Sequence, residues 1–244
     1  MTYPHLPEVD LHTHTVASGH AFSTISEIAA VAACKGLRGI GMTDHGPALP
    51  GGPHPYHFHA LRFVPPYLHG VRILRGIEAN IIGPGELDLP EHSLKRLDLI
   101  MAGFHEDCGF RGHDLTENTE ALMHLMEKHR LHVITHLGNP VFPIDAVAVA
   151  KRAAELGVAI EINNASFSIS RKGSADNCRR MAEHCARFGT LVSISSDAHI
   201  AETVGVMDHA LQAAQESGVR WEQIVNRTLE STLTFLGLDA TSPA

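Results

Sequence analysis

The sequence of 244 residues is poor in cysteine and in aromatic residues. It contains four cysteines, three tyrosines and one tryptophan, and aromatic residues make up 5% of the chain. No Cys-x-x-Cys pair occurs, and a chain of this length does not need disulfides to stabilise its core. We therefore expect buried free thiols rather than bridges or metal ligands at Cys34, Cys108, Cys178 and Cys185.

Positive charge is also scarce. Lysine and arginine total 19 against 27 aspartates and glutamates, which gives a formal net charge of −8. Without a basic run, the chain lacks the electrostatic footprint that binding to duplex nucleic acid requires. It also shows no basic segment followed by an apolar stretch near the N-terminus and no apolar run long enough to span a bilayer. We expect a cytoplasmic protein without a membrane partner.

Histidine, in contrast, is abundant. The 19 histidines equal lysine and arginine combined. Because histidine is the commonest metal ligand among side chains, the composition alone favours a metal-binding protein.

Short β-rich apolar runs alternate with helical patterns along the chain, and this alternation predicts an α/β fold with a parallel sheet or barrel. The predicted strands are Val9–His14, Leu37–His45, Val71–Ile82, Leu97–His105, His132–His136, Val158–Asn163 and Leu191–Asp197. The predicted helices are Ser26–Lys35, Thr116–His129, Asp145–Glu155 and Ser174–Arg187, with Gly36, Gly157 and Gly189 just past three of their ends. Proline and glycine predict a loop over Gly46–Pro55, and no change in composition divides residues 1–244, so we expect a single domain.

Metal-type ligands follow the predicted strands. His12 and His14 are two residues apart at the end of the first run, so the period of a strand places both side chains on one face. Asp197 and His199 repeat this spacing after the seventh run. Other runs carry His45, Glu78, His105 and His136. Six of seven strands thus deliver a ligand, and parallel α/β barrels place their active sites at the carboxyl ends of the strands. The spacing alone does not include His20, six residues beyond His14.

In these motifs the sequence resembles the polymerase and histidinol phosphatase (PHP) superfamily, and within it the YcdX-like phosphatases. The resemblance covers about Asp10 to Leu236. It rests on Asp10-Leu-His-Thr-His14, Thr43-Asp-His45, Gly76-Ile-Glu78, Gly103-Phe-His105, Thr135-His136, Ser196-Asp-Ala-His199 and, for the subgroup, Ile73–Asn80 and Ser170–Ser174. The resemblance implies a distorted (βα)7 barrel of the PHP type, similar to a TIM barrel, and a centre of three divalent cations. These are usually Zn2+, with Mn2+ or Fe2+ in relatives.

The resemblance also implies which residues bind each cation. It assigns the first to His12, His14, Glu78 and Asp197, the second to Glu78, His105 and His136, and the third to His20, His45 and His199. Glu78 would bridge two cations, and Glu78 and Asp197 are the expected catalytic residues.

Such a centre suits an anionic substrate. Two carboxylates and seven neutral imidazoles leave an excess of positive charge on three divalent cations, which a phosphate dianion would offset. A metal-bridging hydroxide, formed from water whose pKa the cations lower toward about 7, would attack the phosphorus. We therefore expect a hydrolase that acts on small phosphate monoesters.

Further residues are candidates for supporting roles. Arg171 and Lys172 could bind phosphate oxygens, although a solvated basic pair is an equal alternative. Asn163 and Asn164 line the barrel mouth or are turn residues. Asp10 and Asp44 are expected to accept hydrogen bonds from the ring nitrogens of ligand histidines, or else to be ordinary turn carboxylates. The segment from His54 to His59 is either a lid over the site or a solvated loop.

Three other functions remain open. A phosphodiesterase or 3'-5' exonuclease fits relatives that accompany DNA polymerases, but the net charge opposes it. A metal store without catalysis would permit closed four-ligand sites. An amidohydrolase would require a lysine at a strand end, which the sequence lacks.

The resemblance also implies a homo-oligomer, specifically a homotrimer.

Overall fold

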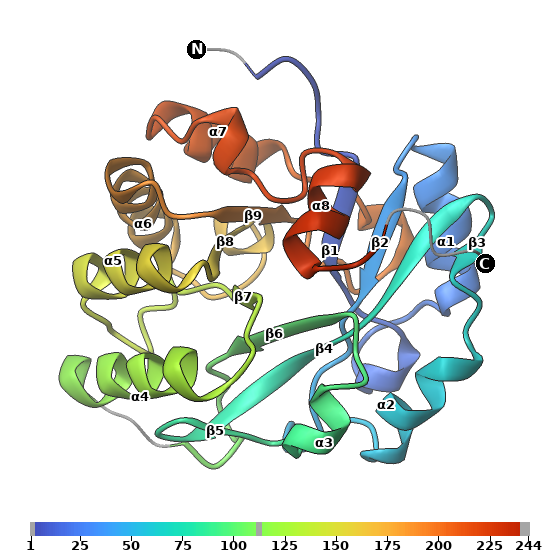
Figure 1. Ribbon diagram of the computed structural model, residues 1–244, viewed down its shortest axis with the longest axis horizontal. Helices are drawn as coiled ribbons and strands as arrows, with labels where there is room; N and C mark the ends of the chain where they lie inside the picture. The colour runs from blue at the N-terminus through green and yellow to red at the C-terminus, as the bar shows by residue number, and fades with distance from the viewer. Residues whose placement is uncertain (1–2, 111–113, 240–244) are drawn as a thin grey trace.

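Seven parallel strands form a ring in the computed structural model, which describes residues 3–110 and 114–239 (Figure 1). The strands hydrogen-bond in chain order: β1 (Val9–Thr13), β2 (Gly39–Met42), β4 (Val71–Gly83), β6 (Leu99–Gly103), β7 (Val133–Ile134), β8 (Ala159–Asn163) and β9 (Val192–Ser195). The ring nearly closes because the backbone N–H of His14 donates to the oxygen of Ala198 at 2.9 Å, and that of Ala198 donates to His12 at 3.3 Å. The predicted barrel is confirmed. Each predicted run contains one of these strands, except that β4 extends one residue past the run Val71–Ile82.

Helices surround the ring (Figure 1). All four predicted helices are present, as α1 (Ile25–Cys34), α4 (Leu115–Lys128), α5 (Ala146–Leu156) and α6 (Ala175–Phe188). The sequence analysis missed α2 (Tyr56–Ala60), α3 (Glu91–Leu94), α7 (Asp208–Glu216) and α8 (Leu229–Leu236), and it missed β3 (Tyr67–Leu68) and β5 (Glu86–Leu87), which pair antiparallel with β4. Gly46–Pro55 contains no helix or strand, as predicted. None of the described helices is long and apolar enough to cross a membrane.

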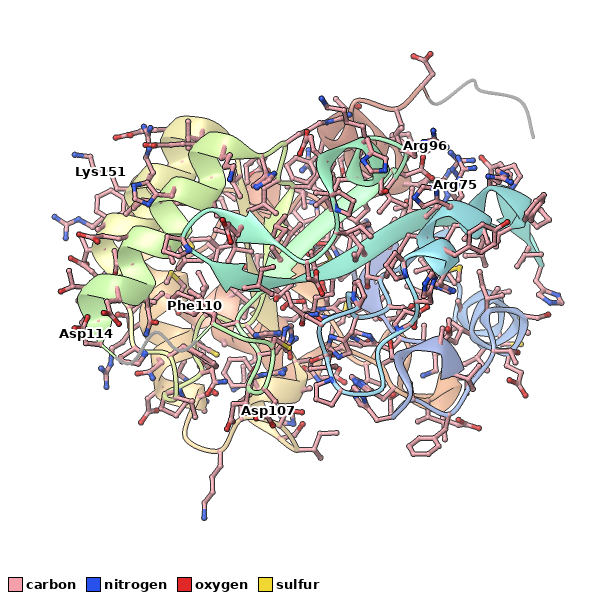
Figure 2. All side chains as sticks on the ribbon, turned by 90° about the horizontal axis from the view of Figure 1, so that it is seen from below. Arg75, Arg96, Asp107, Phe110, Asp114 and Lys151 are labelled. Atoms are coloured by element: carbon pink, nitrogen blue, oxygen red, sulfur yellow. The ribbon has the colours of Figure 1, made fainter. Side chains whose placement is uncertain are left out.

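Local sequence explains where the helices begin and end. Thr24 and Glu27 form a reciprocal capping box before α1, and Asp145 accepts hydrogen bonds from the first backbone amides of α5. Gly157 and Gly189 end α5 and α6 in the left-handed conformation, with φ of 70° and 71°. Lys151, on α5, points away from the sheet into solvent (Figure 2).

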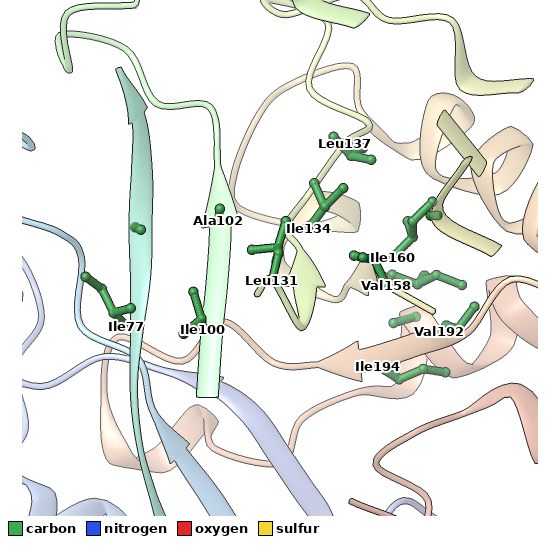
Figure 3. Packing of buried hydrophobic residues seen from close by; sticks show 14 of the residues in the cluster. Ile77, Ile100, Ala102, Leu131, Ile134, Leu137, Val158, Ile160, Val192 and Ile194 are labelled. Carbon is green, nitrogen blue, oxygen red and sulfur yellow. The ribbon is translucent and has the colours of Figure 1, made fainter. Parts of the chain in front are cut away.

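The main core lies between the sheet and the helices. Ile100, Ile134, Ile160 and Ile194 come from four neighbouring strands and pack in one apolar cluster (Figure 3). Full burial of each such side chain contributes about 1.5–3 kcal/mol. Because side chains alternate along a strand, the residues beside these isoleucines face the inside of the barrel. On β8 that inward residue is Glu161.

A second apolar cluster closes one end of the barrel. Leu229, Leu233 and Leu236 of α8 pack there against residues near the starts of the strands, such as Val9 and Leu99. The opposite end, where the strands finish, stays available for polar side chains. The residues on either side of β6 mark the two ends of the barrel. Arg96 precedes β6 and Asp107 follows it, and the two lie on opposite faces of the molecule (Figure 2).

A β-bulge in β1 turns the first candidate ligands toward this open end. The pairing of β1 with β2 shifts register between Asp10 and Thr13. Leu11 therefore packs in the cluster that contains α8, while the next residue, His12, contacts Glu78 inside the barrel. A bulge re-aims side chains in this way because it adds a residue to one strand only.

The expectation for the cysteines was right for three of the four. Cys108, Cys178 and Cys185 are buried free thiols. Cys34 is also free, but it is exposed, so the prediction that it is buried was wrong. Cys34 is the last residue of α1, and it falls outside the buried face that Ile28, Ala29 and Ala32 form.

Candidate metal centre

Glu78 lies at the centre of the predicted ligands. Its Oε2 atom is 3.1 Å from Nε2 of His12 and 2.9 Å from Nδ1 of His45. Its Oε1 atom is 2.7 Å from Nε2 of His136 and 3.4 Å from Nε2 of His105. Glu78 was grouped with ligands at strand ends, but it lies within its strand. β4 continues for five residues past it, to Gly83, much as the predicted run Val71–Ile82 does, because its last part forms a hairpin with β5.

The remaining predicted ligands gather around Asp197. Its Oδ1 atom lies 3.2 Å from Nε2 of His14 and 3.6 Å from Nδ1 of His199. The Nε2 atom of His199 is in turn 3.1 Å from Nε2 of His20. His20 thus reaches the cluster although it comes from a loop, which the strand pattern alone did not predict.

Several buried polar atoms of these side chains make close contacts with one another but no hydrogen bond. Among the described residues, no hydrogen bond is made by Nε2 of His12, Nε2 of His14, Nδ1 of His45, either ring nitrogen of His105, or Oε2 of Glu78. Each buried atom left in this state costs about 1–3 kcal/mol. Divalent cations use the lone pairs of imidazole and carboxylate, so the donor set fits such ions.

The ligand atoms also cluster at the right scale. The described residues contain three groups of side chains whose potential ligand atoms all lie within 4.8 Å of one another inside each group. The groups are His12, His14 and Glu78; His45, Glu78 and His105; and His14, His45 and His199. The groups share members, so neighbouring cations would share ligands. This arrangement differs from the one that the resemblance implies. The first group lacks Asp197, the second has His45 in place of His136, and the third has His14 in place of His20.

The electrostatics of the site favour positive charge. Burial alone would raise the pKa of Glu78, but His12 and His105 outweigh it and hold the pKa well below its usual range. Burial alone would lower the pKa of His12, but Glu78 and Glu161 outweigh it and raise the pKa well above the ordinary value. The carboxylates therefore create a negative potential at the point where the imidazoles converge.

Two other imidazoles are held neutral, the form that binds metal. Burial, together with the nearby His45, lowers the pKa of His14 to about 3. Burial, together with Arg171, lowers the pKa of His136 to about 4. Neither ring needs to lose a proton at pH 7 before it can act as a ligand.

The backbone is strained at the same place. His136, Arg171 and Asp197 have φ of 34°, 50° and 58°, values in the left-handed region that non-glycine residues rarely adopt. Strain of this kind persists only where the surrounding structure imposes it, and it concentrates at functional sites.

Arg171 and Lys172 have different environments. Arg171 is largely buried, and its Nη2 atom donates to Oδ2 of Asp197 at 2.6 Å and to Oδ1 of Asn163 at 3.0 Å. Burial alone would lower the pKa of Arg171, but Asp197 outweighs it and raises the pKa. The alternative of a solvated pair is therefore wrong for Arg171. Lys172 is exposed, and the structure does not bring it into the site.

The expected partners of the ligand histidines were wrong. Asp10 accepts hydrogen bonds from the backbone of His12, Ser196 and Gly205, and Asp44 accepts from Thr15 and Ser18. Both carboxylates thus organise loops rather than the rings of candidate ligands, because short side chains beside a strand end reach the neighbouring backbone first. The ring that Asp44 contacts belongs to His57, which is not a candidate ligand.

The partner of a ligand ring is instead Glu161, which sequence analysis missed. Its Oε1 atom lies 2.7 Å from Nδ1 of His12, and its Oε2 atom accepts from the backbone N–H of His136 at 3.0 Å. Its place in the apolar run Ala159–Asn163 was the available indication, since a carboxylate at an inward position of a buried strand requires partners.

Asn163 and Asn164 face the site, as one of the two alternatives had it. The Nδ2 atom of Asn163 donates to Asp197 at 3.1 Å, and Asn164 lines the cavity over the cluster.

The segment from His54 to His59 is partly helical, in α2. It is held in place by His57, 3.3 Å from Asp44, and by His59, 2.7 Å from Ser93. Whether this segment acts as a lid stays a prediction.

A cavity of about 610 Å3 opens over the cluster. Its lining includes the candidate ligands His20, His45, His105, Asp197 and His199, which we call its floor, and the segments that follow β8 and β9, which we call its walls. A volume of this size accommodates a small molecule. The fold and the site together define an α/β-barrel protein with a candidate centre for several cations beneath an open cavity.

Comparison with known proteins places this architecture in a family. Residues 10–228 match the PHP domain family, which is most of the chain. A protein of Syntrophotalea carbinolica named "probable phosphatase" is 57% identical over 232 residues, which cover 95% of this chain and 97% of that protein. A second so named, from Caldanaerobacter subterraneus subsp. tengcongensis, is 44% identical over 93% of this chain and 90% of its own length. The chain belongs to the PHP domain family.

Solved structures agree on the fold. Histidinol phosphate phosphatase from Lactococcus lactis subsp. lactis, determined with zinc, L-histidinol and phosphate, superimposes with a TM-score of 0.65. The alignment covers 88% of this chain and 95% of that protein, at 15% sequence identity. At this identity the likeness establishes the fold alone.

Proposed function

We propose that this PHP-family phosphatase hydrolyses small phosphate monoesters at a centre of three divalent cations, with zinc as the usual ion and manganese or iron as alternatives. The proposed ligands are His12, His14, His20, His45, Glu78, His105, His136, Asp197 and His199. The match to the PHP domain over residues 10–228 supports treating the chain as one catalytic domain.

One observation carries the proposal: the buried lone pairs without partners lie directly beneath an open cavity. His45 and His105 each have ring nitrogens without a hydrogen-bond partner among the described residues, and both line the cavity floor. A cation held there could be reached by a substrate, whereas a storage site would permit closure by four protein ligands. Bound divalent cations would lower the pKa of a water molecule and neutralise charge on phosphoryl oxygens.

The protein's own residues would bind and orient the phosphate. The Nε atom of Arg171 donates to Ser166, and its Nη2 atom donates to Asn163 and Asp197. Its Nη1 atom makes no hydrogen bond within the described part of the chain. Because Arg171 lines the cavity, we assign the free Nη1 donors to a phosphate oxygen. The ion pair with Asp197 would keep both the guanidinium and the candidate ligand in place. This refines the role expected of Arg171 and leaves Lys172 outside it.

The relatives and the neighbouring structure support the substrate class. Proteins that are 57% and 44% identical over nearly their whole length are named as phosphatases. The enzyme from Lactococcus lactis was determined with zinc and phosphate together. Its phosphate ester is not assigned to this chain, because the two sequences share 15% identity.

The test compares p-nitrophenyl phosphate with bis(p-nitrophenyl) phosphate, using protein loaded with zinc or manganese. A recessed site suits a terminal phosphate better than one flanked by two bulky groups, so kcat/KM should be higher for the monoester. A chelator should abolish the rate and added metal should restore it. If the bis-ester or single-stranded DNA proves the far better substrate, a phosphodiesterase or exonuclease replaces this proposal. If neither ester is hydrolysed by metal-loaded protein, the alternative of a non-catalytic metal-binding protein stands.

A further inference from the structure

The walls of the cavity carry exposed apolar side chains. Ile169 is 89% exposed, Ile200 is 41% exposed and Val206 is 38% exposed, and all three line the same cavity as the candidate ligands. Single exposed apolar residues are common on protein surfaces and require no explanation. Three such residues in the walls of one cavity do require an explanation, because they give its lining apolar surface in addition to the polar candidate ligands.

The position of these residues connects them to substrate selection. Ile169 lies in the segment that joins β8 to α6, and Ile200 and Val206 lie in the segment that joins β9 to α7. In α/β barrels the loops that follow the strands shape the substrate site, while the strands hold the catalytic groups. Ile169 is two residues from Arg171, and Ile200 is the residue after His199. A substrate whose phosphate reaches Arg171 must therefore place its remaining atoms against these walls.

The charges around the cavity limit what those atoms can be. Arg171 is the only lysine or arginine among the described residues that line it, and its charge is paired with Asp197 at 2.6 Å. The other charged wall residue is the exposed Glu106. A second phosphate or a carboxylate on the substrate would therefore meet apolar side chains, neutral polar groups such as those of Asn164 and Ser168, and a carboxylate, but no second lysine or arginine. Burial of an unpaired charge against such walls is unfavourable.

We infer that the substrate is a phosphate monoester with a single anionic group, whose alcohol part is uncharged and largely apolar and packs against Ile169, Ile200 and Val206. This inference rests on the proposed function, since it identifies which monoesters that site selects. In this inference the wall residues determine which substrate binds, and the candidate ligands on the floor serve the reaction itself.

A series of alkyl phosphates tests the inference. Ethyl, butyl and hexyl phosphate share a primary-alcohol leaving group, so they differ in apolar surface and hardly in intrinsic reactivity. With metal-loaded protein, kcat/KM should rise at least about tenfold from ethyl to hexyl phosphate, as expected if each added methylene is about half buried. 1,4-Butanediol bisphosphate, which adds a second dianion, should be a poorer substrate than butyl phosphate.

Variants locate the preference. Ile169→Ser and Ile200→Ser should each lower the ratio of hexyl to ethyl kcat/KM by about threefold or more, because they remove apolar wall surface. Leu156→Ser is the matched control. The exposed fraction of Leu156, 39%, is similar to that of Ile200, but Leu156 lies at the end of α5 and does not line the cavity. It should leave the ratio unchanged.

The outcomes separate the inference from the proposed function. If all alkyl phosphates are hydrolysed at similar kcat/KM, or if the bisphosphate is preferred, the inference is overturned and the phosphatase proposal stands. A chain-length preference that survives both isoleucine substitutions also overturns it, because the apolar surface must then lie elsewhere. If no monoester is hydrolysed, p-nitrophenyl phosphate included, the proposed function fails and the inference fails with it.

Discussion

The Oε1 atom of Glu161 lies 2.7 Å from Nδ1 of His12, and both side chains are fully buried. An Nδ1–H that donates to this carboxylate leaves Nε2 of His12, 3.1 Å from Glu78, as the ring nitrogen that could bind a cation after it releases its proton. The other oxygen of Glu161 accepts from the backbone of His136. One carboxylate that touches no cavity wall thus orients two candidate ligands from different strands.

Glu161→Gln should weaken metal binding. The amide retains one acceptor in place of two, so either His12 or the backbone N–H of His136 loses its partner. Loss of such a contact typically lowers metal affinity by about 10- to 100-fold. Titration of zinc against a competing chelator measures the effect. Glu155→Gln, the same change at an exposed position on α5, is the control and should bind zinc as the unmodified protein does. Equal affinities for both variants would show that Glu161 has no orienting role.

The purified protein should carry two to three divalent ions per chain when metal is supplied during expression. Nine candidate ligands exceed the needs of one cation, and the three overlapping groups of ligand atoms offer separate positions. Elemental analysis of the protein, referred to its concentration, gives the number directly. A value of one or less would refute the trinuclear centre.

Glu78→Gln should reduce kcat more than Arg171→Ala does. Glu78 lies within 3.6 Å of five candidate ligand histidines, so loss of its charge should release cations and lower the rate by about 10^3-fold or more. Arg171→Ala removes a phosphate donor and the partner of Asp197, which should cost about 10- to 100-fold with most of the metal retained. Kinetics and metal content are measured on the same samples. Intact metal content and rate in Glu78→Gln would contradict its assigned role.

His132 should make the protein sensitive to acid. Burial, with a smaller effect of Arg130, lowers the pKa of this imidazole from 6.5 to about 4, and its Nδ1 accepts from the backbone N–H of Ile100. As the pH falls, the unfolded chain binds this proton first, so stability is complete above pH 6.5 and declines toward pH 4. His132 should contribute about 2 kcal/mol to the loss between pH 7 and pH 4.5.

Urea unfolding of the His132→Asn variant at pH 7 and pH 4.5 checks this. The variant should lose less stability than the unmodified protein over that interval, since asparagine keeps an acceptor but does not titrate. His69→Asn, at an exposed histidine, controls for the substitution itself. Release of metal in acid affects all three proteins alike and cancels in the comparison. Identical losses for the two variants would rule out the contribution of His132.

The strands could be predicted from the sequence because buried strands appear in it as short runs of apolar residues. The run Val158–Asn163, for example, contains β8, and Asp145–Glu155 contains nearly all of α5. The predicted ligands converge in the structure because six of the seven parallel strands supply them, and the carboxyl ends of these strands meet at one end of a barrel. Short helices such as α2 and α3 escaped prediction, since four or five residues carry too little periodicity to reveal a helix.

Contacts across the barrel could not be predicted in the same way. Asp10 and Asp44 were expected to hold the rings of ligand histidines because they adjoin ligands in sequence. Their oxygens instead meet backbone and hydroxyl groups and, for Asp44, the ring of His57. The residue that holds a ring, Glu161, is 149 positions from His12. A hydrogen bond over that separation depends on the register and curvature of the whole sheet, which no local pattern specifies.

The sequence by itself determined the alternation of strands and helices, the residue types of the candidate centre and the order in which the strands supply them, because each of these follows from local periodicity and spacing. Tertiary structure alone decided the bulge that separates Leu11 from His12, the pairing of Arg171 with Asp197 and the apolar walls at Ile169 and Ile200. The physical reason is distance along the chain: closure of the barrel brings together segments that have no sequence relation, and only there do charge, burial and shape act on one another.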